Sequence, residues 1–257
     1  MLFRCGVLFC ELGRAGLWVE TALEAYPSDK IYIPLLDLDK VEIREQLRWE
    51  IRSGYIRYLH FGLPCKGWGP ANRLNGGTRS AQFPDGASEC LPRESLANFQ
   101  GNYVCELCAE LDAVGGFFTI ENPWSSDVWR SSPFSRLRDV VNIFLIPLDQ
   151  CAFGHQLPKA SQFAFCMKAT GLAANFPEIK EMSIRCPGLS AFHPHDVAWG
   201  SRKVSGTCLS LAKAAGRYPR KLCAALARVM RIKIAASSHP TAFLGVRPHG
   251  AGSRDPA

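Results

Sequence analysis

Two short apolar runs that stop abruptly at proline and polar residues constrain the fold of this chain most strongly. Residues 58–63 lead directly into Pro64, and residues 117–120 lead directly into Glu121. Apolar runs of this length, closed by glycine, proline or polar residues, indicate buried strands that feed loops. Buried strands of this kind are typical of α/β proteins, in which helices cover both faces of a sheet.

Further segments of the expected sheet and its helices follow from the same patterns. Additional apolar runs at 7–12, 31–36, 140–148 and 163–167 predict strands, the last forming a hairpin with the segment before it. Helical spacing predicts amphipathic helices over 40–52, 96–114 and 220–233. We therefore expect an α/β fold with a mostly parallel sheet flanked by helices.

Cys65 is the first candidate functional residue. It follows the strand at 58–63 directly and opens a loop that contains Lys66 and Gly67. Ligands of open α/β sheets bind beyond the carboxyl ends of the strands, and a neighbouring cation favours a reactive thiolate. The alternative is that Cys65 is a small buried apolar residue, as many intracellular cysteines are.

Glu121 is the second candidate, because it follows an apolar strand and should lie at the rim of the sheet. A half-buried carboxyl group has a raised pKa and can donate a proton. The alternative is an ordinary solvated carboxylate. A thiol and a carboxylic acid at one edge of a sheet would provide a nucleophile and a general acid.

Three motifs in order resemble the DNA (cytosine-5) methyltransferases, and most nearly a short, divergent branch of that family. The first motif comprises Pro64, Cys65, Trp68, Ala71 and Asn72. The second is ENPWSSDVW, residues 121–129, and the third lies in CAFGHQLPKAS, residues 151–161. The agreement of three ordered elements over about a hundred residues is more specific than any one of them.

This resemblance implies a Rossmann-like, S-adenosylmethionine-dependent methyltransferase fold and methyl transfer to carbon-5 of cytosine in DNA. Cys65 would be the nucleophile at carbon-6 and Glu121 the acid that protonates the ring. The substrate contacts would come from Trp68, Asn122, Pro123 and Lys159. Trp124 or Phe153 is an alternative stacking partner for the flipped base. The alternative function is that of a non-catalytic descendant, a nucleic-acid-binding or interaction protein from a mobile or viral-type element.

The family's cofactor motif, Phe-x-Gly-x-Gly, is only partly present near the N-terminus. Phe9, Gly13 and Gly16 can be aligned to it after a predicted strand, but no single register uses all of them. Asp37, at the end of the second predicted strand, would hydrogen-bond a ribose hydroxyl. With Pro64, these residues form the expected S-adenosylmethionine site. Tyr218-Pro219 resembles the family's final motif, which packs near the cofactor.

Composition is compatible with a nucleic-acid partner in a reducing compartment. The net charge of +7 suits a polyanion such as DNA, or RNA. Eleven scattered cysteines indicate free thiols, and no signal peptide or membrane span is evident, so we expect an intracellular protein of the nucleus or cytoplasm. Cys105 and Cys108 form a CxxC within a predicted helix. The nearest further candidate ligands, Cys186, His193 and His195, are irregularly spaced, so we expect no metal site.

One domain over residues 1–234 is expected, followed by a disordered tail at 235–257. Within it, residues 171–200 would be a reduced target-recognition region whose histidines are loop residues or phosphate contacts. The polar segment 74–92 lies beside the predicted nucleophile. It predicts either a mobile lid or a disordered insertion that packs against nothing.

Overall fold

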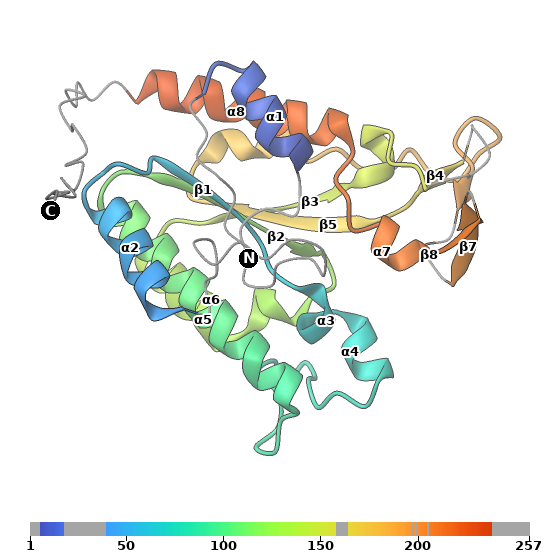
Figure 1. The fold of residues 1–257 in the computed structure, drawn as a ribbon, viewed down its shortest axis with the longest axis horizontal. Helices are drawn as coiled ribbons and strands as arrows, with labels where there is room; N and C mark the ends of the chain where they lie inside the picture. Colours follow the sequence, from blue (N-terminus) through green and yellow to red (C-terminus); the bar gives the residue numbers. More distant parts are fainter. Residues whose placement is uncertain are drawn as a thin grey trace, which may run out of the picture.

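A four-stranded mixed sheet forms the centre of the protein in this computed structural model, which describes residues 6–17, 40–157, 164–196, 198, 200–204 and 206–237 (Figure 1). Its strands lie in the order β1-β2-β5-β3. Their bounds are β1 Tyr58–Gly62, β2 Phe117–Pro123, β3 Phe144–Asp149 and β5 Ala169–Ala174. Both predicted apolar runs that precede Pro64 and Glu121 are strands of this sheet.

The expectation of a mostly parallel sheet is wrong. β1 and β2 pair in parallel, whereas β5 pairs antiparallel with both β2 and β3. Because β5 reverses direction between them, β2 and β3 still run the same way. The carboxyl ends of β1, β2 and β3 therefore lie at one edge of the sheet, where ligands of α/β folds usually bind.

Helices cover both faces of the sheet and enclose two apolar clusters (Figure 1). On one face lie α2 Val41–Arg52, α5 Pro92–Ala113 and α6 Ser132–Val140. On the other lie α1 Gly6–Arg14 and α8 Arg220–Ala236, with the short 3-10 helix η4 Pro177–Met182. The α/β class is thus confirmed, and the predicted helices at 40–52, 96–114 and 220–233 match α2, α5 and α8.

The predicted strand at 7–12 is a helix instead, α1. Leu8 and Leu12 are spaced four residues apart, so both lie on the same side of the helix and belong to the apolar cluster that includes Leu226 and Met230 of α8. An apolar run this short is compatible with the period of a strand and with that of a helix, and contact with α8 favours the helix. The predicted strand at 31–36 lies outside the described residues.

The segment that follows Cys65 and its loop is ordered and packed. α3 Cys65–Trp68 and α4 Pro70–Leu74 are followed by irregular backbone that leads to α5. Arg79 and Glu94 are buried along this path. The expectation that nothing in 74–92 could pack is therefore wrong, because the backbone of this segment packs around the buried side chain of Arg79.

The remaining elements form a small region next to the main sheet. β4 Phe165–Cys166 pairs in parallel with β6 His195–Asp196, and β7 Ser201–Val204 pairs with β8 Thr207–Ser210. The predicted hairpin at 163–167 is thus wrong, since β4 pairs with a segment thirty residues later. Three further short helices complete the described part of the fold. They are η2 Asp127–Arg130, η3 Gln150–Phe153 and α7 Leu211–Ala214.

Two predicted boundaries also change. Gly171 lies inside β5 of the central sheet, so the region expected at 171–200 begins only after that strand. α8 continues to Ala236, and residues 238–257 of the expected tail lie outside the described part of the chain. Among the described residues, no helix combines the length and apolar character needed to cross a bilayer.

Candidate active site

The parallel pairing of β1 and β2 brings the two candidate reactive residues to the same edge of the sheet. The register places Gly62 opposite Glu121, and Cys65 follows Gly62 by three residues as the first residue of α3. α3 sits tightly against α5, because a Cβ on Gly67 would lie 2.5 Å from the Cβ of Ala97. The close approach that glycine permits fixes the loop that carries Cys65.

Two side chains from distant parts of the sequence contact the carboxylate of Glu121, which is only 8% exposed. The hydroxyl of Tyr218 donates a hydrogen bond to Oε2 at 3.0 Å. Nζ of Lys168 lies 3.5 Å from Oε1. Glu121 is therefore at the sheet rim, as predicted, but it is held by a phenol and an ammonium group and is not freely solvated.

The thiol of Cys65 shares an electrostatic environment with the same two groups. Cys65 is exposed as a residue, yet partial burial of its thiol raises its pKa. The positive charge of Lys168 lowers that pKa, and the negative charge of Glu121 raises it. Lys168, rather than the predicted neighbour Lys66, is thus the cation that favours the thiolate.

A chain of buried polar side chains runs from the sheet to Glu121. Tyr58 Oη and His60 Nδ1 lie 2.7 and 2.8 Å from Thr119 Oγ1, and His60 Nε2 lies 3.2 Å from the hydroxyl of Tyr218. Burial lowers the pKa of His60 to about 3, so the ring is neutral near pH 7.

These contacts select one arrangement of protons. Since Tyr218 donates its single proton to Glu121, it must accept from His60 Nε2–H, which leaves Nδ1 of the neutral ring to accept from Thr119. Each donor has an acceptor, so the chain fixes the position of the Tyr218 hydroxyl at the carboxylate. It acts as a positioning network behind the candidate site.

Asn122 and Pro123 support the site from within β2. The buried amide of Asn122 donates through Nδ2 to the carbonyl of Leu63 at 2.9 Å, which ties β2 to the residue just before Pro64. The carbonyl of Pro123 accepts from the indole of Trp129 at 2.9 Å. Asn122 therefore holds the backbone that carries Cys65, while its Oδ1 has no hydrogen-bond partner among the described residues.

The predicted role of Trp68 in stacking on a substrate base is wrong in this conformation. Its ring is fully buried in the core, and the guanidinium of Arg79 lies over it at 3.7 Å. Arg79 also donates to the carbonyl oxygens of Gly67 and Pro84, each at 2.6 Å. Trp68 and Arg79 thus anchor the loop after Cys65. Trp124, the alternative stacking partner, is exposed, whereas Phe153 is buried.

The described residues do not form the predicted cofactor cradle. Gly13 lies within α1, and Gly16 follows the helix with a φ of 79°. A Cβ added at either glycine would meet nothing within 4 Å. Glycines at a helix end terminate the helix and do not place a strand-to-helix turn against a nucleotide.

The other predicted contacts have separate outcomes. Phe9 belongs to α1, which packs on α8 and not within the sheet. Pro64 lies directly before Cys65 at the start of α3, and its contact with a cofactor stays a prediction. Asp37 and Lys159 lie outside the described residues. Cys105 and Cys108 are buried in α5, where burial raises the pKa of Cys105 to about 12.

Sequence reasoning missed Lys168 and Tyr218 as neighbours of Glu121, and His60 as the residue that contacts the Tyr218 hydroxyl. The Tyr218-Pro219 motif predicts a place for Tyr218 near the cofactor, not beside Glu121. Lys168 and His60 carry no motif, and their contacts depend on how β1, β2 and the start of β5 are paired. In comparisons with known proteins, no family model, curated protein or solved structure matches this chain.

Proposed function

We propose that this protein activates cytosine in DNA by covalent addition, in the manner of the DNA (cytosine-5) methyltransferases that its motifs resemble. The single observation that supports this most is the placement of Cys65 and Glu121 at the ends of adjacent parallel strands, with Lys168 acting on both. The net charge of +7 suits a polyanionic substrate. The substrate base must leave the duplex stack to reach such a site.

The reaction begins with transfer of the Cys65 thiol proton to the Glu121 carboxylate, while Lys168 stabilises the thiolate that remains. The thiolate attacks carbon-6 of cytosine, and a new S–C6 bond forms as the C5=C6 double bond is lost. Glu121, in its protonated form, delivers its proton to ring nitrogen N3, which takes up the displaced electron pair. The product is an enamine whose carbon-5 is nucleophilic.

The residues described here support these steps up to the enamine. In the family, S-adenosylmethionine supplies the methyl group that carbon-5 attacks. Gly13 and Gly16 do not form a cradle for that cofactor, so we derive no step through it. The proposed chemistry of Cys65 and Glu121 can nevertheless be tested without any methyl donor.

The test uses hydrogen exchange at carbon-5. In D2O, the enamine takes deuterium at carbon-5, and elimination of the thiolate then releases the original hydrogen and restores an aromatic, deuterated base. We expect the full chain to incorporate deuterium at cytosine in a DNA oligonucleotide, as measured by mass spectrometry of the released nucleosides. Cys65→Ala should abolish the exchange and Glu121→Gln should slow it by two orders of magnitude or more, in the range of general acid catalysis (roughly 10²–10⁴-fold).

Cys208→Ala is the matched control, because Cys208 is an exposed thiol on β8. Exchange that persists in Cys65→Ala would remove Cys65 from its role. DNA binding without exchange in the unaltered protein would instead favour the non-catalytic binding function. Exchange confined to an RNA oligonucleotide would reassign the substrate.

A further inference from the structure

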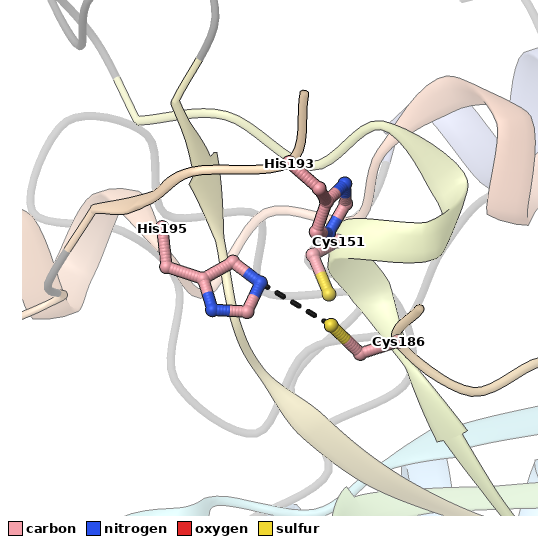
Figure 2. A group of neighbouring side chains, drawn as sticks. All are labelled: Cys151, Cys186, His193 and His195. Atoms are coloured by element: carbon pink, nitrogen blue, oxygen red, sulfur yellow. Dashed lines mark hydrogen bonds between the residues drawn. The ribbon is translucent and has the colours of Figure 1, made fainter. Parts of the chain in front are cut away.

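A second group of reactive side chains converges away from Cys65, at the junction of the main sheet with the small region. One ligand atom from each of Cys151, Cys186, His193 and His195 lies within 4.8 Å of the others (Figure 2). Cys151 comes from η3, His195 from β6, and the other two from the irregular segment that joins η4 to β6. Residues 35, 7 and 2 positions apart therefore meet at one point.

Hydrogen bonds of the surrounding backbone fix the positions of the two thiols. Oδ2 of the buried Asp149 accepts hydrogen bonds from the amide of Cys186 at 2.9 Å and from Nε of Arg185 at 2.8 Å. The amide of Asp149 in turn donates to the carbonyl of Ile184 at 3.0 Å. These contacts fasten the 183–186 segment to the end of β3, directly beside Cys151.

His193 lies just before β6 and His195 begins it. Residues two apart in an extended chain project toward one face, so His193 and His195 can both reach the thiols. Ser190 and His193 form a bridge that closes the preceding turn. The ring of Phe165 stacks on His193 with 4.5 Å between the ring centroids, and the amide of Phe165 donates to the Pro194 carbonyl at 2.8 Å.

The distances within the cluster suit a tetrahedral ion. Sγ of Cys186 lies 3.3 Å from Nε2 of His195 (Figure 2). Ligands at the usual zinc–sulfur and zinc–nitrogen lengths of about 2.3 and 2.0 Å would lie roughly 3.5 Å apart in a tetrahedron. The amide of Gly188 also donates to Sγ of Cys186 at 3.3 Å, an interaction that stabilises a thiolate ligand.

One atom in the cluster lacks any hydrogen-bond partner that the described residues could offer. Nε2 of His193 is buried and unsatisfied. Buried polar atoms in native proteins nearly always have a partner, and a metal ion bound by the group to which His193 belongs would supply one. We propose that Cys151, Cys186, His193 and His195 form a structural Cys2His2 zinc site. The CxxC of Cys105 and Cys108 is not part of it.

The arrangement fits a structural role better than a catalytic one. Four protein ligands fill a tetrahedral zinc coordination sphere and leave no open position for substrate or water. The ion would join η3 to the 183–193 segment and β6, whose described residues belong to none of the three buried apolar clusters. It would thereby hold the region that follows β5 against the main sheet.

Metal content of the full, tag-free chain tests the proposal. After expression in zinc-supplemented medium and purification under reducing conditions without chelator, we expect about one zinc per chain by elemental analysis. Cys151→Ser and Cys186→Ser should each lose that zinc. Cys208→Ser, which removes an exposed thiol outside the cluster, should retain it.

A second measurement uses only the unaltered chain, in case the serine variants do not fold. Cobalt(II) added to the chelator-treated protein should give the visible absorption of a tetrahedral site with two thiolate ligands, and zinc should displace it. Zinc should also protect Cys151 and Cys186 from alkylation, as read by peptide mass spectrometry. Metal-free protein whose Cys151 and Cys186 are alkylated equally with and without zinc would overturn the proposal, as would a Cys151–Cys186 disulfide in protein purified without reductant and with no metal bound.

Discussion

Removal of the charge on Glu94 should destabilise the protein in a way that depends on pH. Glu94 is fully buried at the start of α5. Its carboxylate accepts hydrogen bonds from Asn72 Nδ2 at 2.6 Å, from the hydroxyl of Thr78 at 2.7 Å and from the amide of Leu91 at 3.1 Å. In Glu94→Gln, the side-chain NH2 would replace one carboxylate oxygen. This NH2 is a donor and cannot accept from the surrounding donors, so at least one of these hydrogen bonds would be lost.

The size of the effect follows from the pKa. Burial opposes ionisation of Glu94, but the hydrogen bonds from Thr78, Asn72 and Leu91 outweigh it and lower the pKa from an ordinary 4.5 to about 2. At 1.36 kcal/mol for each pKa unit, the ionised carboxylate contributes about 3 kcal/mol to the free energy of unfolding at neutral pH. Because the folded pKa is depressed, this contribution is present above pH 4.5 and is lost as the pH falls toward 2.

Urea unfolding followed by tryptophan fluorescence measures this contribution, since Trp68 is buried beside the same loop. We expect Glu94→Gln to lower the free energy of unfolding by about 3 kcal/mol at pH 7 and by only about 1 kcal/mol near pH 3. Glu89→Gln, an exposed acid of the same loop, should change it by less than about 0.5 kcal/mol. A Glu94→Gln deficit of equal size at both pH values would refute the role of the charge.

Two further substitutions test the surroundings of Cys65. Lys168→Met should raise the pKa of the Cys65 thiol and slow its alkylation by iodoacetamide at pH 7.5 roughly tenfold, because a neighbouring cation commonly lowers a pKa by about one unit. Lys66→Met should leave the rate unchanged, and equal slowing in both variants would contradict the assignment. Arg79→Met keeps an apolar stem over Trp68 but leaves the Gly67 and Pro84 carbonyls without their donor, so the free energy of unfolding should fall by about 3 kcal/mol. A loss below about 1 kcal/mol in urea unfolding would show that Arg79 does not organise the loop.

Strongly periodic segments were predictable from the sequence, and short or small-residue segments were not. α5 carries apolar residues at steps of three and four over many turns, so only a helix accommodates it. β5 has the sequence ATGLAA, in which Thr170 is the one β-branched residue and small residues predominate, so little in the sequence indicates its position in the sheet. Gly171 is required there because a Cβ would lie 2.8 Å from the Trp129 ring, a contact visible only in three dimensions.

The candidate site divides in the same way. The positions of Cys65 and Glu121 near one edge of the sheet could be predicted because each comes at the end of an apolar run that forms a strand. Lys168 and Tyr218 reach Glu121 from positions 47 and 97 residues later, so no local pattern indicates them. The Cys2His2 cluster lacked the paired spacing by which zinc sites are recognised, whereas the CxxC of α5 had the spacing but lies in a helix core.

The proposed zinc site and the candidate active site are attached to the same stretch of backbone. The side chain of Lys168 reaches Glu121, while its carbonyl accepts the amide of Gln150 at 3.0 Å, one residue before Cys151. Nε2 of Gln150 also donates to Thr170 at 3.0 Å, the residue that pairs with Pro123 of β2. An ion that fixes Cys151 would therefore also fix the strand end from which Lys168 projects. If both proposals hold, the zinc site supplies the rigid attachment that lets a flexible lysine side chain act on the Cys65 thiol.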